Sequence, residues 1–426
     1  MALARAEASA GVIPKAAADG IADAGKADGF DIAGLVRDTL RSGTPGVPLA
    51  KALTERVRAR SPEAAGFVHW GATSQDVADT ALVLLLKRAQ PILSADLARL
   101  ETALRNLSEK HKSTVMLGRT LMQPAPPVTF GLKAAGWLGA ISRCAKRLEA
   151  AFAEALMVQF GGATGTLAAL GGHGPAVARA LAKELGLSCP DAPWHAHRDR
   201  LATLISACGV VTGSLGKVAR DISLLMQNEV AEVAEPSGQD RGGSSTMPHK
   251  RNPVGCAVTL AAAHRVPGEV AAFLSAMVQE HERGVGGWQA EWPVVASVIQ
   301  STGLAAASMA EVAEGLSVDP ARMRANIENT KGVIFAERAM MLLGSSLGRD
   351  AAQKLLREAT RQSISRSRPL SQVLAEMPEV TSRLDASGLR QLEVPEQYLG
   401  AAETFRQALL SSSRETKTPN KNKKEQ

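Results

Sequence analysis

Apolar residues recur at three- and four-residue intervals along five long segments of the chain. The stretch LISACGVVTGSLGKVARDISLLM shows this pattern clearly, and such spacing predicts an amphipathic helix. We expect long helices over residues 76–112, 129–157, 199–235, 253–283 and 289–316. Because proline removes a backbone donor, Pro91 should kink the first helix and Pro267 should bend the fourth.

Helices of this length predict a bundle as the centre of the fold. At ~1.5 Å per residue, a thirty-residue helix is on the order of 45 Å long. The stretch VDPARMRANIEN predicts a short helix with Asp319 as its cap, and further short helices follow it. No run of residues indicates a strand. We therefore expect an all-α fold with an elongated central helix bundle and smaller helical domains at each end.

This pattern predicts four regions along the chain. They are an N-terminal helical domain over 1–90, a central bundle over 91–332, a C-terminal helical domain over 333–412 and a disordered basic tail over 413–426. Composition agrees with helices, since hydrophobic residues make up 45% of the chain but aromatic residues only 3%. Alanine, leucine and valine must then fill the core, and alanine-rich helices can pack closely.

The net charge of +7 suits a small anionic substrate. No aromatic residues alternate with the basic ones, so we expect no nucleic acid as a partner. The four cysteines are widely spaced, and no histidine pair has convincing ligand spacing, so we expect free thiols and no metal. No signal sequence or membrane span is recognisable, and the default expectation is a cytoplasmic protein.

Three polar, glycine-bearing stretches interrupt the predicted helices: HWGATSQD (69–76), GRTLMQPAPPVTFG (118–131) and GGSSTMPHKRNPVG (242–255). Each borders a helix end, where unpaired N–H groups favour an anion. Structural explanations remain open for the first two. Thr73, Ser74 and Asp76 could cap a helix, and the prolines of the second stretch could stiffen a connector.

The third stretch is harder to explain structurally. Gly242 and Gly243 permit an irregular loop, and a serine pair follows them. Lys250 and Arg251 add positive charge beside these hydroxyls. Removing a proton next to a carboxylate creates a second negative charge, which fixed donors must stabilise. The composition of the loop therefore favours proton transfer on a carboxylate substrate.

GSSTMPHKRNP resembles the signature loop of the fumarase/aspartase (class II) superfamily, a GSSxMPxKxNP pattern. HWGATSQD and GRTLMQPAPPVTFG resemble the other two motif regions of that family, in the same order, and the similarity covers nearly the whole chain. Within the superfamily, QFGGATGTLAALG, PWHAHRDRL and QEHERGVGGWQAEW look most like the bacterial branch of cycloisomerases that act on 3-carboxy-cis,cis-muconate.

The resemblance implies a homotetramer whose active sites each combine motifs from three subunits. It implies a small anionic polycarboxylate substrate and no cofactor. The catalytic residues carried over are Ser244, Lys250 and His249. The substrate-binding residues are Thr73, Ser74, Thr120, Gln123, Ser245, Asn252 and Arg283. His69, His195 and His197 remain weaker candidates for contact with the substrate.

One departure from the superfamily concerns the second motif. Lyases of this superfamily that release fumarate carry a histidine after the motif's threonine, where this chain has Leu121. The segment HERGVGGW also lacks the serine run of adenylosuccinate lyases. Both departures favour the cycloisomerase branch. The resemblance further implies a few dozen residues upstream of ARAEASAGVIP, so the N-terminal domain is expected to be truncated.

The expected reaction is cofactor-free conversion of 3-carboxy-cis,cis-muconate to 4-carboxymuconolactone, a step of protocatechuate/β-ketoadipate aromatic catabolism. Two alternatives remain open: a fumarate-releasing lyase of the adenylosuccinate type, and an inactive structural homologue. The sequence leaves undecided whether the third substituent of the substrate is a carboxylate or a sulfonate. It also leaves undecided the proton donor and the stereochemistry of addition.

Overall fold

The structure is a computed structural model that describes residues 1–238, 242–243, 247 and 250–414. It divides into two compact units. Unit 1 comprises Met1–Ala95, Arg147–Val211 and His264–Gly303, and unit 2 comprises Asp96–Lys146, Thr212–Ala263 and the chain from Leu304 onward. The predicted domain boundaries stay a prediction, and the expected tail lies almost wholly outside the described residues.

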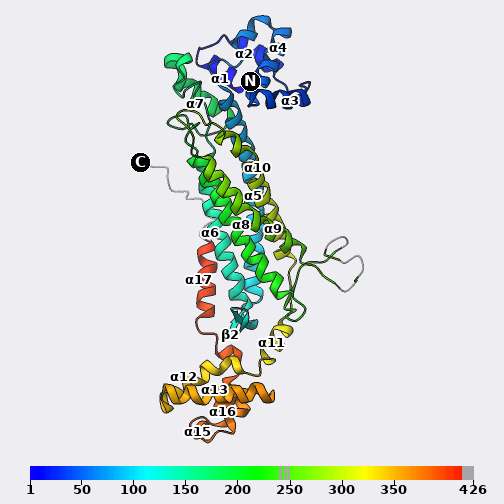
Figure 1. Cartoon of the computed structure of the whole chain (residues 1–426), viewed down its shortest axis with the longest axis vertical. Helices are drawn as coiled ribbons and strands as arrows, with labels where there is room; N and C mark the ends of the chain where they lie inside the picture. Colours follow the sequence, from blue (N-terminus) through cyan, green and yellow to red (C-terminus); the bar gives the residue numbers. More distant parts are fainter. Residues whose placement is uncertain (239–241, 244–246, 248–249, 415–426) are drawn as a thin grey trace. The chain divides into compact units, whose positions relative to one another are not determined.

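The prediction of long helices is confirmed (Figure 1). They are α5 (Ser74–Lys110), α6 (Phe130–Ala155), α8 (Asp199–Leu225), α9 (Val254–Ala276) and α10 (Gly287–Glu314). α5 continues through Pro91 and α9 through Pro267. Each of the five helices contributes residues to both units.

Two predicted helix ends are wrong, because α8 and α9 stop well before residues 235 and 283. After α8 the chain forms a short strand, β3 (Val233–Ala234), which pairs with β4 (Ser317–Val318). After α9 the chain turns through His281, which has a left-handed backbone with φ of 45°. The apolar pattern continues past both ends, so it could not reveal where the backbone leaves the helix.

Small residues allow the long helices to pack closely within unit 2. A Cβ atom on Gly216 of α8 would lie 2.6 Å from the Cβ of Ala263 on α9. The last helix, α17 (Ala402–Arg414), joins this bundle. A Cβ atom on Gly139 of α6 would lie 2.7 Å from Leu409 of α17. The close packing expected from the alanine-rich composition is therefore present.

Short helices surround the ends of the long ones in unit 1. They are α1 (Ala2–Ser9), α2 (Lys15–Ala24), α3 (Ile32–Ser42), α4 (Gly46–Arg60), η1 (Pro62–Phe67), η2 (Ala168–His173) and α7 (Gly174–Leu185). Ile13, Ile21 and Val57 lie in one small core of this region, and Leu170, Val177 and Leu181 lie in another. The turn between α4 and α5 carries the first polar motif.

Unit 2 contains the rest of the short helices. They are α11 (Pro320–Glu328), η3 (Val333–Phe335), α12 (Ala336–Leu347), α13 (Arg349–Arg366), α14 (Leu370–Ala375), α15 (Pro378–Thr381), α16 (Ala386–Leu392) and η4 (Pro395–Gln397). The predicted cap of α11 is confirmed, since the Asp319 carboxylate accepts a hydrogen bond from the Arg322 N–H at 2.9 Å. Phe335, Leu356 and Leu370 belong to the core that joins these helices.

The expectation of no strands is wrong for the second polar motif. β1 (Val115–Thr120) and β2 (Gln123–Thr129) form an antiparallel hairpin. Gly118 lies beside the irregularity in its register, where a Cβ atom would come 2.2 Å from a backbone oxygen of β2. Three prolines in β2 remove donors and disguise the strand in the sequence.

Candidate functional site

The first polar motif forms the start of α5 in unit 1, and Asp76 organises it. The Asp76 carboxylate accepts hydrogen bonds from the Thr73, Gly161 and Gly162 N–H groups at 3.0, 3.0 and 2.9 Å. The Gln159 amide donates a fourth at 3.0 Å. Burial raises the pKa of Asp76 despite these donors. The capping interpretation is therefore confirmed for Asp76, which also ties the motif to the QFGG segment.

Arg283 lies against the same turn, as the second component of the site. Its Nη1 donates to the Gln75 side-chain oxygen at 2.7 Å, and its Nε donates to the Ala163 carbonyl at 3.2 Å. Its Nη2 donates to the Gly162 carbonyl. Since Asp76 binds Thr73 and Gly162 together, unit 1 brings Thr73, Ser74 and Arg283 to one place.

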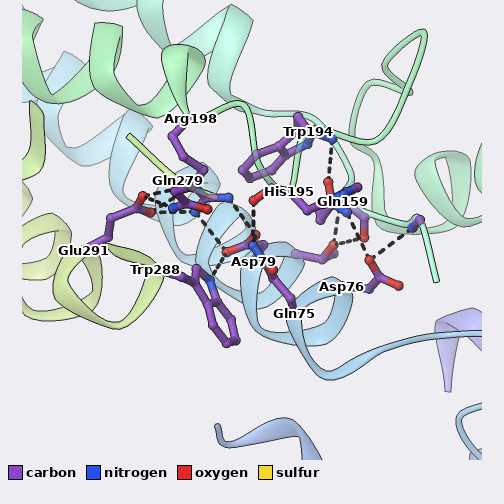
Figure 2. A network of polar contacts seen from close by, with 12 residues as sticks. Gln75, Asp76, Asp79, Gln159, Trp194, His195, Arg198, Gln279, Trp288 and Glu291 are labelled. Atoms are coloured by element: carbon purple, nitrogen blue, oxygen red, sulfur yellow. Dashed lines mark hydrogen bonds and ion pairs between the residues drawn. The ribbon is translucent and has the colours of Figure 1, made fainter. Parts of the chain in front are cut away.

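A buried ionic network adjoins this turn through Gln75 (Figure 2). The Arg198 guanidinium is fully buried and contacts Asp79 and Glu291, each at 2.7 Å. Trp288 donates to Asp79 at 2.9 Å, and burial raises the pKa of Glu291. One guanidinium therefore faces two carboxyl groups inside the protein. Such a buried group is stable only while every partner is present.

Gln75 connects the ionic network to Arg283. Its Nε2 donates to Asp79 at 3.1 Å and to the His195 backbone carbonyl at 2.8 Å. Its Oε1 accepts from Arg283, so every polar atom of this side chain is used. Reasoning from the sequence missed four residues, Gln75, Asp79, Arg198 and Glu291. In the sequence, these residues stand out only as polar side chains within segments that were interpreted for other features, such as PWHAHRDR.

His195 is a buried histidine beside this network, with 6% of its surface exposed. Its Nδ1 has no hydrogen-bond partner among the described residues. Burial, reinforced by the charge of Arg283, lowers the pKa of His195 to about 4, so the ring is neutral near pH 7. Gly165 lies against the ring, where a Cβ atom would come 2.5 Å from Cε1.

The second polar motif forms the tip of the β1–β2 hairpin in unit 2. Thr120 and Gln123 face each other as the last pair of the ladder. Between them, Leu121 and Met122 form a two-residue turn with φ of 48° and 65°. Such a turn normally favours glycine or asparagine, so two apolar residues here are strained. Leu121 is 96% exposed within the single chain.

Of the third polar motif, the structure describes residues 242–243, 247 and 250–255. The Asn252 N–H donates to the Gly242 carbonyl at 2.8 Å and closes the neck of the loop. Lys250 and Arg251 line a cavity of about 630 Å³ in unit 2, together with Asn228 and Asp319. The predicted residues Ser244, Ser245 and His249 lie outside the described residues.

The N-terminus of α9 holds an anion, as expected of a helix end, but this anion belongs to the chain itself. The Glu235 carboxylate accepts from the Gly255 and Cys256 N–H groups at 3.0 and 2.8 Å. The chain thus places its own anion at the helix end.

No group of three metal-binding side chains occurs in the part of the chain that the structure describes. Two helices, α8 and α10, are long and apolar enough to span a membrane by length and composition alone. In their most apolar windows, 56% of residues in α8 and 44% in α10 are buried within the single chain. Core helices of bundle proteins have the same character, so this is weak support for a membrane span.

The chain belongs to the lyase family of the fumarase/aspartase superfamily. Its residues 1–268 match the family described as Lyase, and residues 332–409 match the family described as Adenylosuccinate lyase C-terminus. The all-α, fumarase/aspartase-like fold expected from the sequence is thereby confirmed.

Particular members of the family are close to this chain. It is 47% identical over 96% of its length to 3-carboxy-cis,cis-muconate cycloisomerase of Bradyrhizobium diazoefficiens, covering 91% of that protein. The enzyme of the same name from Pseudomonas aeruginosa is 46% identical over 96% of this chain and 89% of that protein. The crystal structure of 3-carboxy-cis,cis-muconate lactonizing enzyme from Pseudomonas putida superposes with a TM-score of 0.92 at 44% identity, covering 98% of this chain and 93% of that one.

Proposed function

We propose that the protein is a cofactor-free cycloisomerase that converts 3-carboxy-cis,cis-muconate to 4-carboxymuconolactone in aromatic catabolism. The observation that carries the proposal is identity of 47% to a named cycloisomerase over 96% of the chain. The hairpin tip agrees with it. Leu121 occupies the position at which fumarate-releasing members of the superfamily carry a histidine.

The reaction needs little from the protein beyond orientation, charge and a proton. One substrate carboxylate adds to the conjugated double bond and forms the lactone C–O bond. The electron pair of the double bond moves to the adjacent carbon, which then takes a proton. Since the nucleophile belongs to the substrate, catalysis depends on holding it close to the alkene and on stabilising the charge that develops.

The predicted residues supply these roles in separate parts of the chain. Thr73, Ser74 and Arg283 in unit 1 would hold a carboxylate. Thr120, Gln123, Lys250 and Asn252 belong to unit 2. Ser244 would deliver the proton, with Ser245 and His249 close to it in sequence. Lys250 would stabilise the serine alkoxide, because the helix end beside it is already occupied by Glu235.

We further propose that the protein is a cytoplasmic homotetramer with sites shared by three subunits. Exposed apolar residues on the long helices support this, among them Leu85 and Ile92 on α5 and Leu304 on α10, at 59%, 64% and 58% exposure. Large apolar side chains that are exposed in the single chain are those that contact with another subunit would bury. The apolar surfaces of α8 and α10 that remain exposed would then pack against other subunits.

The alternative, a fumarate-releasing lyase, draws support from the match of the C-terminal residues 332–409 to the adenylosuccinate lyase family. Two assays separate the candidates. Purified protein should consume the diene absorbance of 3-carboxy-cis,cis-muconate and release no fumarate from adenylosuccinate. An unchanged muconate spectrum with folded tetramer would contradict the proposal. If adenylosuccinate is not cleaved either, the remaining alternative is an inactive structural homologue.

Paired serine variants test the catalytic assignment within the loop. Ser244→Ala should reduce kcat by ~10²-fold or more while binding of the product lactone is retained, the scale of a lost general acid or base. Ser245→Ala is the matched control and should cost much less. The reverse order of effects would move the proton donor to Ser245. If both variants stay active, a histidine must donate instead.

A further inference from the structure

Two arginines of unit 1 are held in opposite ways. Arg198 is bound by two carboxylates, whereas Arg283 is bound by one amide oxygen and two backbone carbonyls. Among the described residues, no carboxylate forms an ion pair with Arg283. Arg198 is therefore ion-paired inside the protein, whereas the direct hydrogen-bond acceptors of Arg283 are neutral, and the nearby Asp76 and Asp79 carboxylates act on it without direct contact.

The carboxylates nearest to Arg283 are already engaged. Asp76 accepts four hydrogen bonds from neutral groups. Asp79 is bound by Arg198, Trp288 and Gln75. Three of the five guanidinium N–H groups of Arg283 have acceptors, so two remain for a ligand (5 − 3 = 2).

We propose that Gln75 is a positioning residue that orients Arg283 toward the substrate carboxylate and keeps it free of a direct ion pair within the protein. The inference rests on the proposed function, since it needs an anionic substrate at Arg283. Gln75 is only 4% exposed, and its surroundings allow one orientation of the amide. The oxygen must face the Arg283 donor, and the NH₂ group must face the Asp79 and His195 acceptors.

A neutral amide suits this place better than the isosteric carboxylate. A carboxylate in place of the Gln75 amide would form an ion pair with Arg283 and compete with the substrate for its charge. It would also lose the donor to Asp79, which lies one helical turn away, and place two carboxylates together. When protonated, a carboxyl group is neutral and again offers an acceptor to Arg283, together with one of the two donors that the amide has. The effect of the substitution should therefore depend on pH.

The test is Gln75→Glu in the full chain, with binding of tricarballylate measured by calorimetry and kinetics measured with 3-carboxy-cis,cis-muconate. At pH 8 we expect Kd and KM to rise by ~10-fold or more, and both to return toward wild type as pH falls and the introduced carboxylate is protonated. Gln407→Glu is the matched control, because Gln407 likewise donates to a carboxylate one turn away, Glu403, at 2.8 Å on α17. It should leave Kd, KM and their pH profiles unchanged.

A second variant keeps the inference testable if Gln75→Glu fails to fold. Gln75→Met removes the acceptor for Arg283 without adding charge, and should raise Kd and KM severalfold without the pH-dependent recovery. Wild-type Kd and KM in either folded variant at all pH values would overturn the inference. If wild-type protein does not turn over the muconate but binds tricarballylate in a Gln75-dependent way, the proposed reaction fails and the inference stands.

Discussion

Replacing Arg198 by methionine should destabilise the protein strongly, because it strands two buried carboxylates. Arg198 is fully buried, and Asp79 and Glu291 are 2% and 0% exposed. Removing one partner of a buried ion pair typically costs ~3–5 kcal/mol. At about 2.1 cal/mol/K per residue, unfolding of 426 residues has an entropy of roughly 0.9 kcal/mol/K. The expected fall in Tm is therefore roughly 3–6 °C if the chain unfolds in one step.

Arg99→Met is the matched control, since Arg99 also contacts two carboxylates. It pairs with Asp96 and Glu314, each at 2.8 Å, but its side chain is 44% exposed. Exposed pairs contribute ~0.2–1 kcal/mol each, so Tm should fall by no more than about 2 °C. Differential scanning calorimetry at pH 8 measures both variants. Equal effects of the two substitutions would refute the argument that burial decides the cost.

The pH dependence of Arg198→Met gives an independent check. Burial raises the pKa of Glu291 even with the guanidinium present, and removing the guanidinium must raise it further. A carboxyl whose pKa is raised on folding contributes stability at low pH that is lost as pH rises through the folded value. The loss of unfolding free energy in Arg198→Met relative to wild type should therefore be smaller at pH 5 than at pH 8. Adding Asp79→Asn and Glu291→Gln should restore part of the lost stability.

Three further predictions test other parts of the structure. Gly118→Ala should lower Tm, because the added Cβ would lie 2.2 Å from a backbone oxygen. Gly136→Ala in α6 is the control and should not lower Tm, because its Cβ would meet no atom within 4 Å. Equal Tm values for the two variants would contradict the hairpin geometry. Burial raises the pKa of Glu7 from 4.5 to about 8. Glu7→Gln should therefore increase the free energy of unfolding, measured by urea titration, above pH 8 but not at pH 4. An effect that does not depend on pH would argue against a buried acid. Mixed tetramers of Ser244→Ala and Thr73→Ala chains should recover activity, and properly mixed tetramers that recover none would contradict sites shared between subunits.

Much of the fold could be predicted because helix periodicity extends over long segments. The five long helices and the Asp319 cap follow from local patterns. The β1–β2 hairpin could not be predicted in the same way. Its second strand carries three prolines, and its turn uses Leu121 and Met122 instead of the usual glycine or asparagine. Tertiary context holds this conformation against local preference.

The motifs located the candidate site, but not how its parts are held. Gln75 lies between two predicted motif residues, and nothing local indicates that it joins Asp79 to Arg283, 208 positions away. The occupation of the α9 N-terminus was equally hidden, because Glu235 is 20 residues from Gly255 in sequence. Long-range hydrogen bonds of this kind become visible only when the fold is known.

The central claim is that this chain adds a substrate carboxylate across a double bond and protonates the adjacent carbon. The most direct measurement is NMR of the product formed from 3-carboxy-cis,cis-muconate by the purified protein in D₂O. The expected product is 4-carboxymuconolactone with one deuterium on the carbon next to the new C–O bond. Recovery of unchanged muconate, or a product without a lactone ring, would contradict the claim.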